Sequence, residues 1–282
     1  MNVVLKPRKF SLNIKGNLYD LSEPKIMGIL NMTPDSFSDG GKFNSEYQAL
    51  KHAAQMVKGG VDIIDIGPQS TRPGSELLPA SEEIKRIGKI IRKIKTEFPE
   101  TLISLDTFYA ETVRFGVDEG IDIINDISAG QFDPEMLETV AESGLPYILM
   151  HVNSTYAEMH RKNEFEDILL SVNEFLLKKS AQLLDMGIHD IILDPGFGFG
   201  KTVEDQLRLL EDTAHIGLGN FPVLIGISRK SFIYKPLGKS ANEVGAEMAA
   251  LHTKILENGA KILRVHDVAE ARVLVDEFVA NR

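Results

Sequence analysis

The sequence contains no cysteine among its 282 residues. This absence excludes disulfide bonds, thiolate metal sites and cysteine nucleophiles, and it is compatible with a reducing compartment. No apolar run reaches the length of about 18 residues that a membrane-spanning helix needs. The first ten residues, MNVVLKPRKF, carry Lys6, Arg8 and Lys9 where a signal peptide has its apolar core. We therefore expect a cytoplasmic protein that has no membrane partner.

Positive charge is also scarce. Lys and Arg number 31 against 41 Asp and Glu, so the formal net charge is −10 at pH 7. Binding to nucleic acid requires a basic surface that displaces phosphate counterions, and an anionic membrane requires one as well. We therefore expect no nucleic acid partner, although a few cations focused in a cleft still allow a small anionic ligand.

Several catalytic signatures are missing from the sequence. It has no HExxH motif, no pair of histidines at ligand spacing, no P-loop GxxxxGK[ST] and no G-x-S-x-G elbow. These absences argue against a transition-metal site and a serine hydrolase. A hard cation such as Mg²⁺ remains open, held by oxygen ligands such as Asn31 and substrate phosphates.

One pattern repeats along the chain: a short run rich in Ile, Val and Leu, a polar or Gly-rich loop, and an amphipathic stretch. Such runs are typical of parallel strands buried on both faces. We expect strands at 26–30, 61–66, 101–106, 121–127, 146–151, 190–194, 222–228 and 261–266. We expect helices between them, at 45–59, at 81–97 with a cap at Ser81, at 107–119 and at 240–258. This α/β alternation predicts a single (β/α)₈ TIM barrel.

The length by itself is ambiguous, because about 150 residues per domain suggests two domains whereas a barrel of about 250 residues is one. We expect one domain over residues 1–282. The alternating run from Phe10 to Tyr19 predicts a short N-terminal β-hairpin, within an extension of residues 1–25, that closes the barrel bottom. An open doubly wound sheet is the alternative architecture.

Polar residues follow every predicted strand, where a barrel carries its chemistry. They are Asn31, the segment GPQSTRPGS (67–75), Asp106, Asn125, His151, Asp194, the segment SRKSF (228–232), Arg264 and His266. Single residues have structural explanations: Asp106 or Asp126 as helix caps, and His151 as a core residue. His52 and His252 lie within predicted helices and are read as structural. The coincidence at eight strand ends favours one polar pocket.

The residue types indicate what this pocket binds. The carboxylates of Asp106 and Asp194, with the amide of Asn125, suit a flat heterocycle that presents a donor edge. Phe199 suits stacking on that heterocycle or packing against a second aromatic substrate. The groups suited to a phosphate are Arg72, Arg264 and His266.

Several loop segments resemble those of dihydropteroate synthases. They are ILNMTPDSFSDGGKF (29–43), STRPGS (70–75), DPGFGFGK (194–201), SRKSF (228–232) and RVHDV (264–268), with SLDT (104–107) and INDI (124–127) between them in the family's order. The resemblance covers about residues 25–268. It implies a TIM barrel that joins para-aminobenzoate to 6-hydroxymethyl-7,8-dihydropterin pyrophosphate. The products are 7,8-dihydropteroate and pyrophosphate, a step of folate synthesis that sulfonamides target.

The resemblance also implies residue roles. The pterin pocket comprises Asp106, Asn125, Met150, Asp194 and Lys230. The pyrophosphate and Mg²⁺ region comprises Asn31, as the metal ligand, with Arg72, Arg264 and His266. The aminobenzoate site comprises Phe37, Thr71, Pro73, Phe199 and Ser231. The catalytic set comprises Asp106, Asp194, Lys230 and Asp35, the last in a loop that closes over the substrates. The resemblance further implies a homodimer, for which the apolar face of 240–258 is either a contact or ordinary barrel packing.

Two segments depart from the family pattern. Gly67-Pro68-Gln69 stands where the family has Gly-Gly-Glu, and MHVNSTYAEMH (150–160) stands where it reads MHMxGxPxxMQ. Two alternatives therefore stay beside the synthase: a methyltransferase that uses methyltetrahydrofolate and a corrinoid protein, and a catalytically silent pterin-binding protein. Arg72, the SRK run and the RVHD run favour the synthase over the methyltransferase. Retention of the charged site residues weighs against the silent protein.

Overall fold

Parallel strands form the centre of the molecule in the computed structural model, which describes residues 9–32, 41–71, 74–152 and 155–282. Eight strands lie in the order β8-β7-β6-β5-β4-β3-β10-β9. Their bounds are β3 (Lys25–Asn31), β4 (Ile63–Gly67), β5 (Leu102–Asp106), β6 (Ile123–Asp126), β7 (Tyr147–Met150), β8 (Ile191–Asp194), β9 (Leu224–Ile225) and β10 (Ile262–Val265). A parallel bridge between Leu193 in β8 and Val223, the residue before β9, closes the sheet. The predicted (β/α)₈ barrel is confirmed, and the open doubly wound sheet is excluded.

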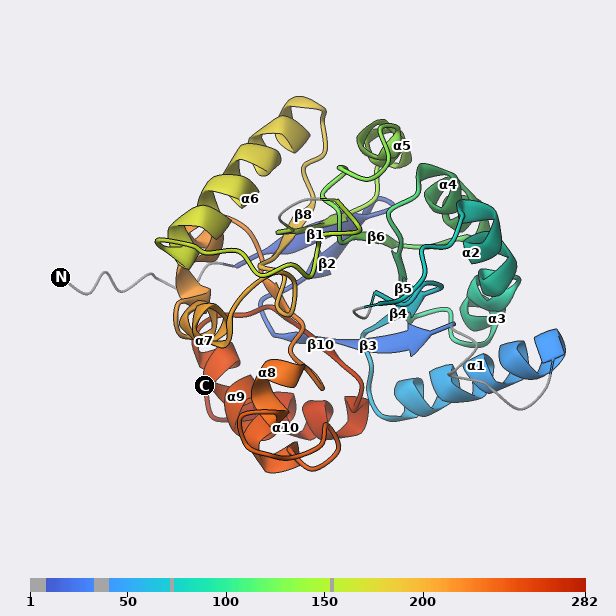
Figure 1. Cartoon of the computed structure of the whole chain (residues 1–282). Helices are drawn as coiled ribbons and strands as arrows, with labels where there is room; N and C mark the ends of the chain where they lie inside the picture. The colour runs from blue at the N-terminus through green and yellow to red at the C-terminus, as the bar shows by residue number, and fades with distance from the viewer. Residues whose placement is uncertain (1–8, 33–40, 72–73, 153–154) are drawn as a thin grey trace.

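Helices surround this barrel (Figure 1). They are α1 (Gly41–Lys58), α2 (Ala80–Ile87), α3 (Ile90–Glu97), α4 (Ala110–Glu119), α5 (Met136–Ser143), α6 (Ile168–Asp185), α7 (Val203–Glu211), α8 (Ser231–Tyr234), α9 (Gly245–Glu257) and α10 (Val268–Ala280), with a 3₁₀ segment η2 (Thr213–Gly219). None of those in the described ranges is long and apolar enough to cross a membrane. The apolar face predicted in 240–258 packs against the barrel through Met248, Leu251 and Ile255.

Two local predictions are wrong. The single helix expected at 81–97 is two helices, because Gly88 takes the left-handed φ of +53° and ends α2. Pro79, not Ser81, precedes the first helical residue, and no side chain caps this end. Strand β9 is also much shorter than the expected run 222–228. Pro222 has no backbone N–H to donate to a neighbouring strand, which limits pairing at that end.

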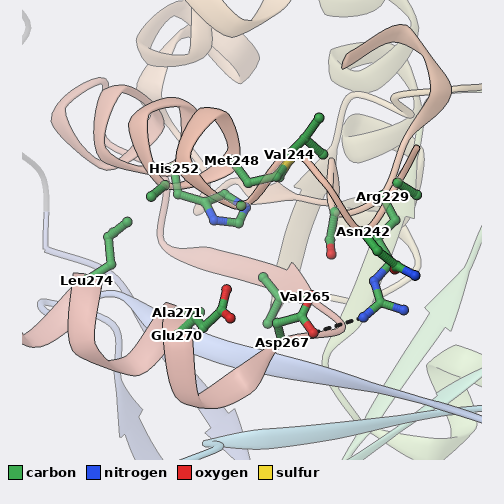
Figure 2. Close-up of a pocket in the computed structure, with 14 residues that line it drawn as sticks. Arg229, Asn242, Val244, Met248, His252, Val265, Asp267, Glu270, Ala271 and Leu274 are labelled. Carbon is green, nitrogen blue, oxygen red and sulfur yellow. Dashed lines mark hydrogen bonds and ion pairs between the residues drawn. The ribbon is translucent and has the colours of Figure 1, made fainter. Parts of the chain in front are cut away.

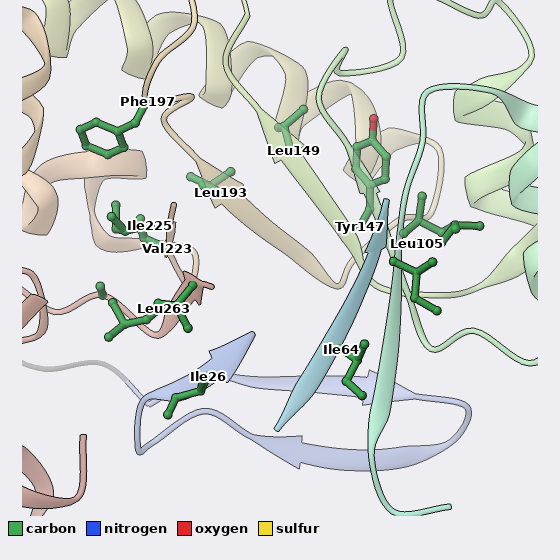
Figure 3. Close-up of a cluster of buried hydrophobic side chains, with 14 of the residues drawn as sticks. Ile26, Ile64, Leu105, Tyr147, Leu149, Leu193, Phe197, Val223, Ile225 and Leu263 are labelled. Atoms are coloured by element: carbon green, nitrogen blue, oxygen red, sulfur yellow. The ribbon is translucent and has the colours of Figure 1, made fainter. Parts of the chain in front are cut away.

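Side chains alternate along each strand, and the outward ones are apolar. These side chains pack under the helices in one continuous core, part of which Figure 3 displays. The strand residues labelled there are Ile26, Ile64, Leu105, Tyr147, Leu149, Leu193, Ile225 and Leu263, and two residues outside the strands, Phe197 and Val223, are labelled with them. Every one of them is at most 5% exposed, so the barrel wall is sealed on its helix side.

An N-terminal hairpin closes the amino end of the barrel. Strands β1 (Ser11–Ile14) and β2 (Asn17–Asp20) pair antiparallel around Lys15 and Gly16, whose φ angles of +52° and +86° suit a two-residue hairpin turn. Leu12 and Ile14, together with Leu21, pack against the first inward-facing residues of the barrel strands. Those residues are Met27, Ile63, Ile123, Ile148, Ile192, Leu224 and Ile262. The prediction of a hairpin at the barrel bottom is confirmed.

The inward positions become polar toward the carboxyl ends of the strands. The side chains of a strand alternate between its two faces, so residues two positions apart point to the same face. The inward apolar residues are followed at this spacing by polar ones: Asp65 after Ile63, Asn125 after Ile123, Asp194 after Ile192, and Arg264 after Ile262. The fold therefore gathers a polar group at the end opposite the hairpin.

Candidate active site

A polar cavity opens at the carboxyl ends of the strands. It is lined by Thr71, Asp106, Asn125, Ile127, Met150, Asp194, Phe197, Phe199, Gly226, Lys230 and Arg264. All of these except Ile127, Phe197 and Gly226 are residues that the sequence predicted for a site. The structure therefore brings together the predicted pterin set and part of the predicted aminobenzoate set.

An ion-pair network forms the floor of this cavity. Arg264 donates from Nε to Asp65 Oδ2 at 2.7 Å and from Nη2 to Asp106 Oδ2 at 2.7 Å. The Asn125 amide nitrogen donates to the same Asp65 carboxylate at 3.1 Å. One guanidinium thus balances two carboxylates, and Asp65 fixes the orientation of the Asn125 amide.

Sequence reasoning missed Asp65. It is completely buried, and a buried carboxylate needs a charged or hydrogen-bonded partner. The available signal was a charge inside the otherwise apolar strand run VDIIDI. Asp62 in the same run plays a different part at the opposite end of the barrel, where it accepts from the Ile26 N–H at 2.8 Å and from Arg272 at 3.3 Å.

Both predicted pterin carboxylates are desolvated. Burial raises the pKa of Asp106 to about 7, with Asp65 and Glu83 adding to the rise and Arg264 opposing it. Burial also raises the pKa of Asp194, although the Gly196 N–H, which donates to its Oδ1 at 2.7 Å, acts in the other direction. These carboxyl groups are therefore strong acceptors for a ligand that brings its own donors.

Two lysines stand beside the carboxylates: Lys201 is buried and Lys230 is half-buried. Burial and the charge of Arg264 lower the pKa of Lys230 to about 8, and its ammonium lies 4.9 Å from the centroid of the Phe199 ring. Burial lowers the pKa of Lys201 to about 7. Lys201, which sequence reasoning did not assign to the site, donates to the carbonyls of Gly196 at 2.9 Å and Phe199 at 3.2 Å. It holds the loop that carries Phe199.

Asn31 ends β3 directly beside the cavity. It pairs in register with Gly67, where an added Cβ would lie 3.6 Å from Asn31 Oδ1 and 3.8 Å from Asp106 Oδ2. The amide oxygen of Asn31 therefore lies on the Asp106 side of the rim. Among the described residues, no cluster of three or more His, Cys, Asp or Glu side chains could hold a metal ion.

His266 and Ser231 do not line the cavity. Burial lowers the pKa of His266 to about 4, which favours the neutral form of the ring at pH 7. Its Nδ1 lies 3.0 Å from Ser228 Oγ. Ser231 begins α8 and is exposed. Four further predicted site residues lie outside the described residues: Asp35, Phe37, Arg72 and Pro73.

Two polar residues near the strand ends are structural. Asp126 accepts hydrogen bonds from the N–H groups of Ser128 and Gly130 at 2.7 Å and from the Tyr147 hydroxyl at 2.6 Å, so it holds a turn. His151 is buried, packs edge-on against Phe175 at 5.0 Å, and has a pKa that burial lowers to about 2. The packing explanation of His151 is the one that its surroundings favour.

A larger cavity of about 390 Å³ lies between α9 and α10 (Figure 2). Val244, Met248 and Leu274 line it, and an ion pair of 2.9 Å between Arg229 and Asp267 spans one edge. Its described lining includes Ser228 and Arg229 of the SRKSF segment, but none of the residues assigned to the pterin, pyrophosphate or aminobenzoate sites. The chemistry is thus concentrated in the smaller cavity.

Comparison with known proteins agrees with this geometry. The family model described as "Pterin binding enzyme" matches residues 27–266. The dihydropteroate synthase of Streptococcus pyogenes is 41% identical over 255 residues, covering 89% of this chain and 92% of the relative. That of Escherichia coli K12 is 41% identical over 258 residues, covering 91% of each.

Solved structures give the same result. Xanthomonas albilineans dihydropteroate synthase with 4-aminobenzoic acid superimposes with a TM-score of 0.89 at 34% identity, covering 97% of this chain and 98% of that one. The same enzyme in complex with 7,8-dihydropteroate gives a TM-score of 0.85 at 32% identity, covering 96% and 98%. The chain belongs to the pterin-binding enzyme family. Within that family, the relatives compared above are dihydropteroate synthases.

Proposed function

We propose that this chain is a transferase with the dihydropteroate synthase activity of its relatives. It joins para-aminobenzoate to 6-hydroxymethyl-7,8-dihydropterin pyrophosphate and releases 7,8-dihydropteroate and pyrophosphate. The observation that carries the proposal is the cavity in which Asp106, Asn125, Asp194 and Lys230 meet. Its relatives' structures contain 4-aminobenzoic acid and 7,8-dihydropteroate, the acceptor substrate and the product of this reaction.

Pterin recognition rests on the acceptors of the cavity. The exocyclic amine and the neighbouring ring N–H of a pterin form a donor edge, and a carboxylate accepts from both. Asp194 supplies such a carboxylate, fixed by the Gly196 N–H. Asn125 is held in one orientation by Asp65 and supplies an amide, while the buried Met150 forms part of the wall.

The leaving pyrophosphate requires cations and donors. Lys230 supplies charge, and Arg72 is assigned here through its place in the STRPGS segment. His266 is proposed to act as a donor to the pyrophosphate; Ser228 Oγ accepts from its backbone N–H at 3.2 Å and lies 3.0 Å from its Nδ1, so these two contacts hold the residue in place. Arg264 has two nitrogens committed to carboxylates, so its main part is to neutralise Asp65 and Asp106.

The donor set fits a Mg²⁺ ion that arrives with the substrate. Mg²⁺ commonly takes one or two protein oxygens and completes its shell with phosphate and water. The amide oxygen of Asn31 on the rim would serve as such a ligand. When bound, Mg²⁺ neutralises charge on the departing pyrophosphate.

The reaction needs no protein nucleophile. The bond between the pterin methylene carbon and the pyrophosphate oxygen breaks, and the oxygen keeps the electron pair. The anionic forms of Asp106 and Asp194 stabilise the electron-poor pterin that results. The arylamine nitrogen then bonds to the methylene carbon and loses a proton to solvent. The residues proposed to border the arylamine are Phe37, Thr71, Pro73, Phe199 and Ser231, and Asp35 is proposed to act from the first loop.

One assay tests the proposal. Purified protein is supplied with dihydropterin pyrophosphate, Mg²⁺ and para-aminobenzoate, and both pyrophosphate and dihydropteroate are measured. We expect equimolar products that depend on para-aminobenzoate. Absence of both products from well-folded protein would refute the activity. Pterin binding without turnover would favour a silent binding protein, and methyl transfer from methyltetrahydrofolate would favour the methyltransferase.

We also propose that residues 1–282 form one domain that works in the cytoplasm as a homodimer, with small molecules as its ligands. The hairpin supports the single domain, because its apolar side chains complete the barrel interior. Light scattering tests the dimer: twice the chain mass of 31.3 kDa is expected, and a species at the mass of one chain would refute it.

A further inference from the structure

The loop after β7 carries a histidine that touches two neighbouring loops of the cavity. His160 lies 2.7 Å through Nε2 from the carbonyl oxygen of Thr71, in the loop after β4. Its ring also stacks on Phe199, in the loop after β8, with centroids 5.3 Å apart and planes inclined by 16°. Strands β5 and β6 separate β4 from β7 in the sheet, so the first contact spans part of the barrel mouth.

The contact with Thr71 shows which nitrogen of the His160 ring carries a proton. A carbonyl oxygen only accepts, so Nε2 must donate the proton to Thr71. Nδ1 is buried and has no hydrogen-bond partner among the described residues. The bond to Thr71 and the stack on Phe199 are therefore the contacts that hold the His160 ring.

Further contacts bind the same segment across the cavity mouth. The Tyr156 hydroxyl lies 3.3 Å from Ser75 Oγ, and its ring packs against Phe108 and Phe132 at centroid distances of 5.6 and 6.3 Å. The Asn163 N–H donates to a carbonyl of the β8 loop at 3.0 Å. This is the segment in which the sequence departs from the family pattern.

We propose that His160 is a positioning residue for the aminobenzoate subsite. It fixes the distance between Thr71 and Phe199, both of which line the cavity and both of which the function proposed above assigns to that substrate. The pterin groups Asn125 and Asp194 are held by other contacts, through Asp65 and Gly196. His160 therefore governs the second substrate and not the first, a claim that rests on the proposed function.

Three variants separate the two contacts. His160→Phe keeps a stacking ring and removes the donor, His160→Gln keeps a donor and removes the ring, and His160→Ala removes both. We expect His160→Ala to raise KM for para-aminobenzoate about tenfold, and each of the other two to raise it about threefold. KM for the pterin pyrophosphate and kcat are expected to stay within about twofold of wild type. His189→Ala, which removes an exposed histidine before β8, is the matched control and should change neither constant.

Hydrogen exchange tests the same contact without turnover. Backbone amides of 74–79 are expected to exchange about fivefold faster in His160→Ala than in wild type, because the Thr71 carbonyl is released. An unchanged KM for para-aminobenzoate in all three variants would overturn the proposal, and so would an equal rise in both KM values. Unchanged exchange would overturn the proposed contact. If wild type made no dihydropteroate, the proposed function would fail while the exchange result would still decide whether His160 holds the loop.

Discussion

Replacing Asp65 with alanine should damage stability and pterin binding together. The substitution removes the acceptor that Arg264 Nε reaches at 2.7 Å and Asn125 Nδ2 reaches at 3.1 Å. Arg264 is then left with Asp106 as its remaining carboxylate partner among the described residues. The Asn125 amide loses the contact that fixes its orientation.

The size of the effect follows from burial. Removing one member of a buried ion pair costs about 3–5 kcal/mol, since the other charge stays behind without its partner. The side chain of Arg264 is 20% exposed and keeps Asp106, so the lower end, about 3 kcal/mol, applies. At about 2–4 °C per kcal/mol for a domain of this size, the melting temperature should fall by about 6–12 °C. Pterin affinity should fall about tenfold to a hundredfold, corresponding to about 1.4–2.8 kcal/mol.

The assay compares Asp65→Ala with Asp62→Ala, an aspartate of the same strand run whose carboxylate lies at the hairpin end. Urea unfolding measures stability, and calorimetry with a phosphate-free pterin measures affinity. Asp62→Ala should cost about 1–2 kcal/mol of stability and leave the pterin dissociation constant unchanged. Asp65→Asn, which keeps one acceptor oxygen, should recover part of both losses. Wild-type affinity in Asp65→Ala, or an equal affinity loss in Asp62→Ala, would refute the reasoning.

Three further predictions concern single groups. Glu83 is buried in α2 and accepts from Thr107 at 2.6 Å, and burial raises its pKa from 4.5 to about 7. The folded state therefore holds this proton more tightly than the unfolded chain, so the wild type loses up to about 3 kcal/mol of stability as the pH rises from 4.5 to 7, whereas Glu83→Gln does not. Urea unfolding of both proteins at pH 5 and pH 7.5 measures this difference. Parallel dependence of stability on pH in the two proteins would contradict the prediction. Gly196 has φ of +72°, and an added Cβ would overlap the carbonyl oxygen of His151. Gly196→Ala should therefore displace the loop after β8 and weaken pterin binding, measured by calorimetry, more than tenfold. An unchanged affinity would exclude that displacement. Asp194→Ala should abolish pterin binding and leave the far-ultraviolet circular dichroism spectrum unchanged, because it removes an acceptor for a buried donor edge; measurable wild-type affinity would show that another group accepts that edge.

The sequence predicts the barrel well because its strands are apolar on both faces and their order along the chain is simple. The sequence predicts the role of a residue less well where that role depends on the position of the side chain along the barrel or on its burial. Asp62 and Asp65 look alike in VDIIDI, and only closure of the barrel places one near the hairpin and the other in the cavity. The lowered pKa of His266 is hidden for the same reason, since the burial that causes it cannot be inferred from the segment RVHDV.

Contacts between loops that are far apart in the sequence are the other feature that the sequence does not predict. Thr71, His160 and Phe199 lie in three loops, and no periodicity relates their positions. The break at Gly88 was missed because a glycine within an amphipathic pattern is often tolerated in a helix. The site residues themselves were predictable because strand ends converge on one rim in any barrel.

The alternation of side chains along the strands also limits how this protein can change. Deleting one residue from β4 would turn Asp65 toward the helices and Ile64 or Ile66 toward the cavity. A single such event would place a carboxylate in the apolar layer and remove the partner of Arg264 at the same moment. We therefore expect a one-residue deletion in β4 to be more damaging than a one-residue deletion in an exposed loop.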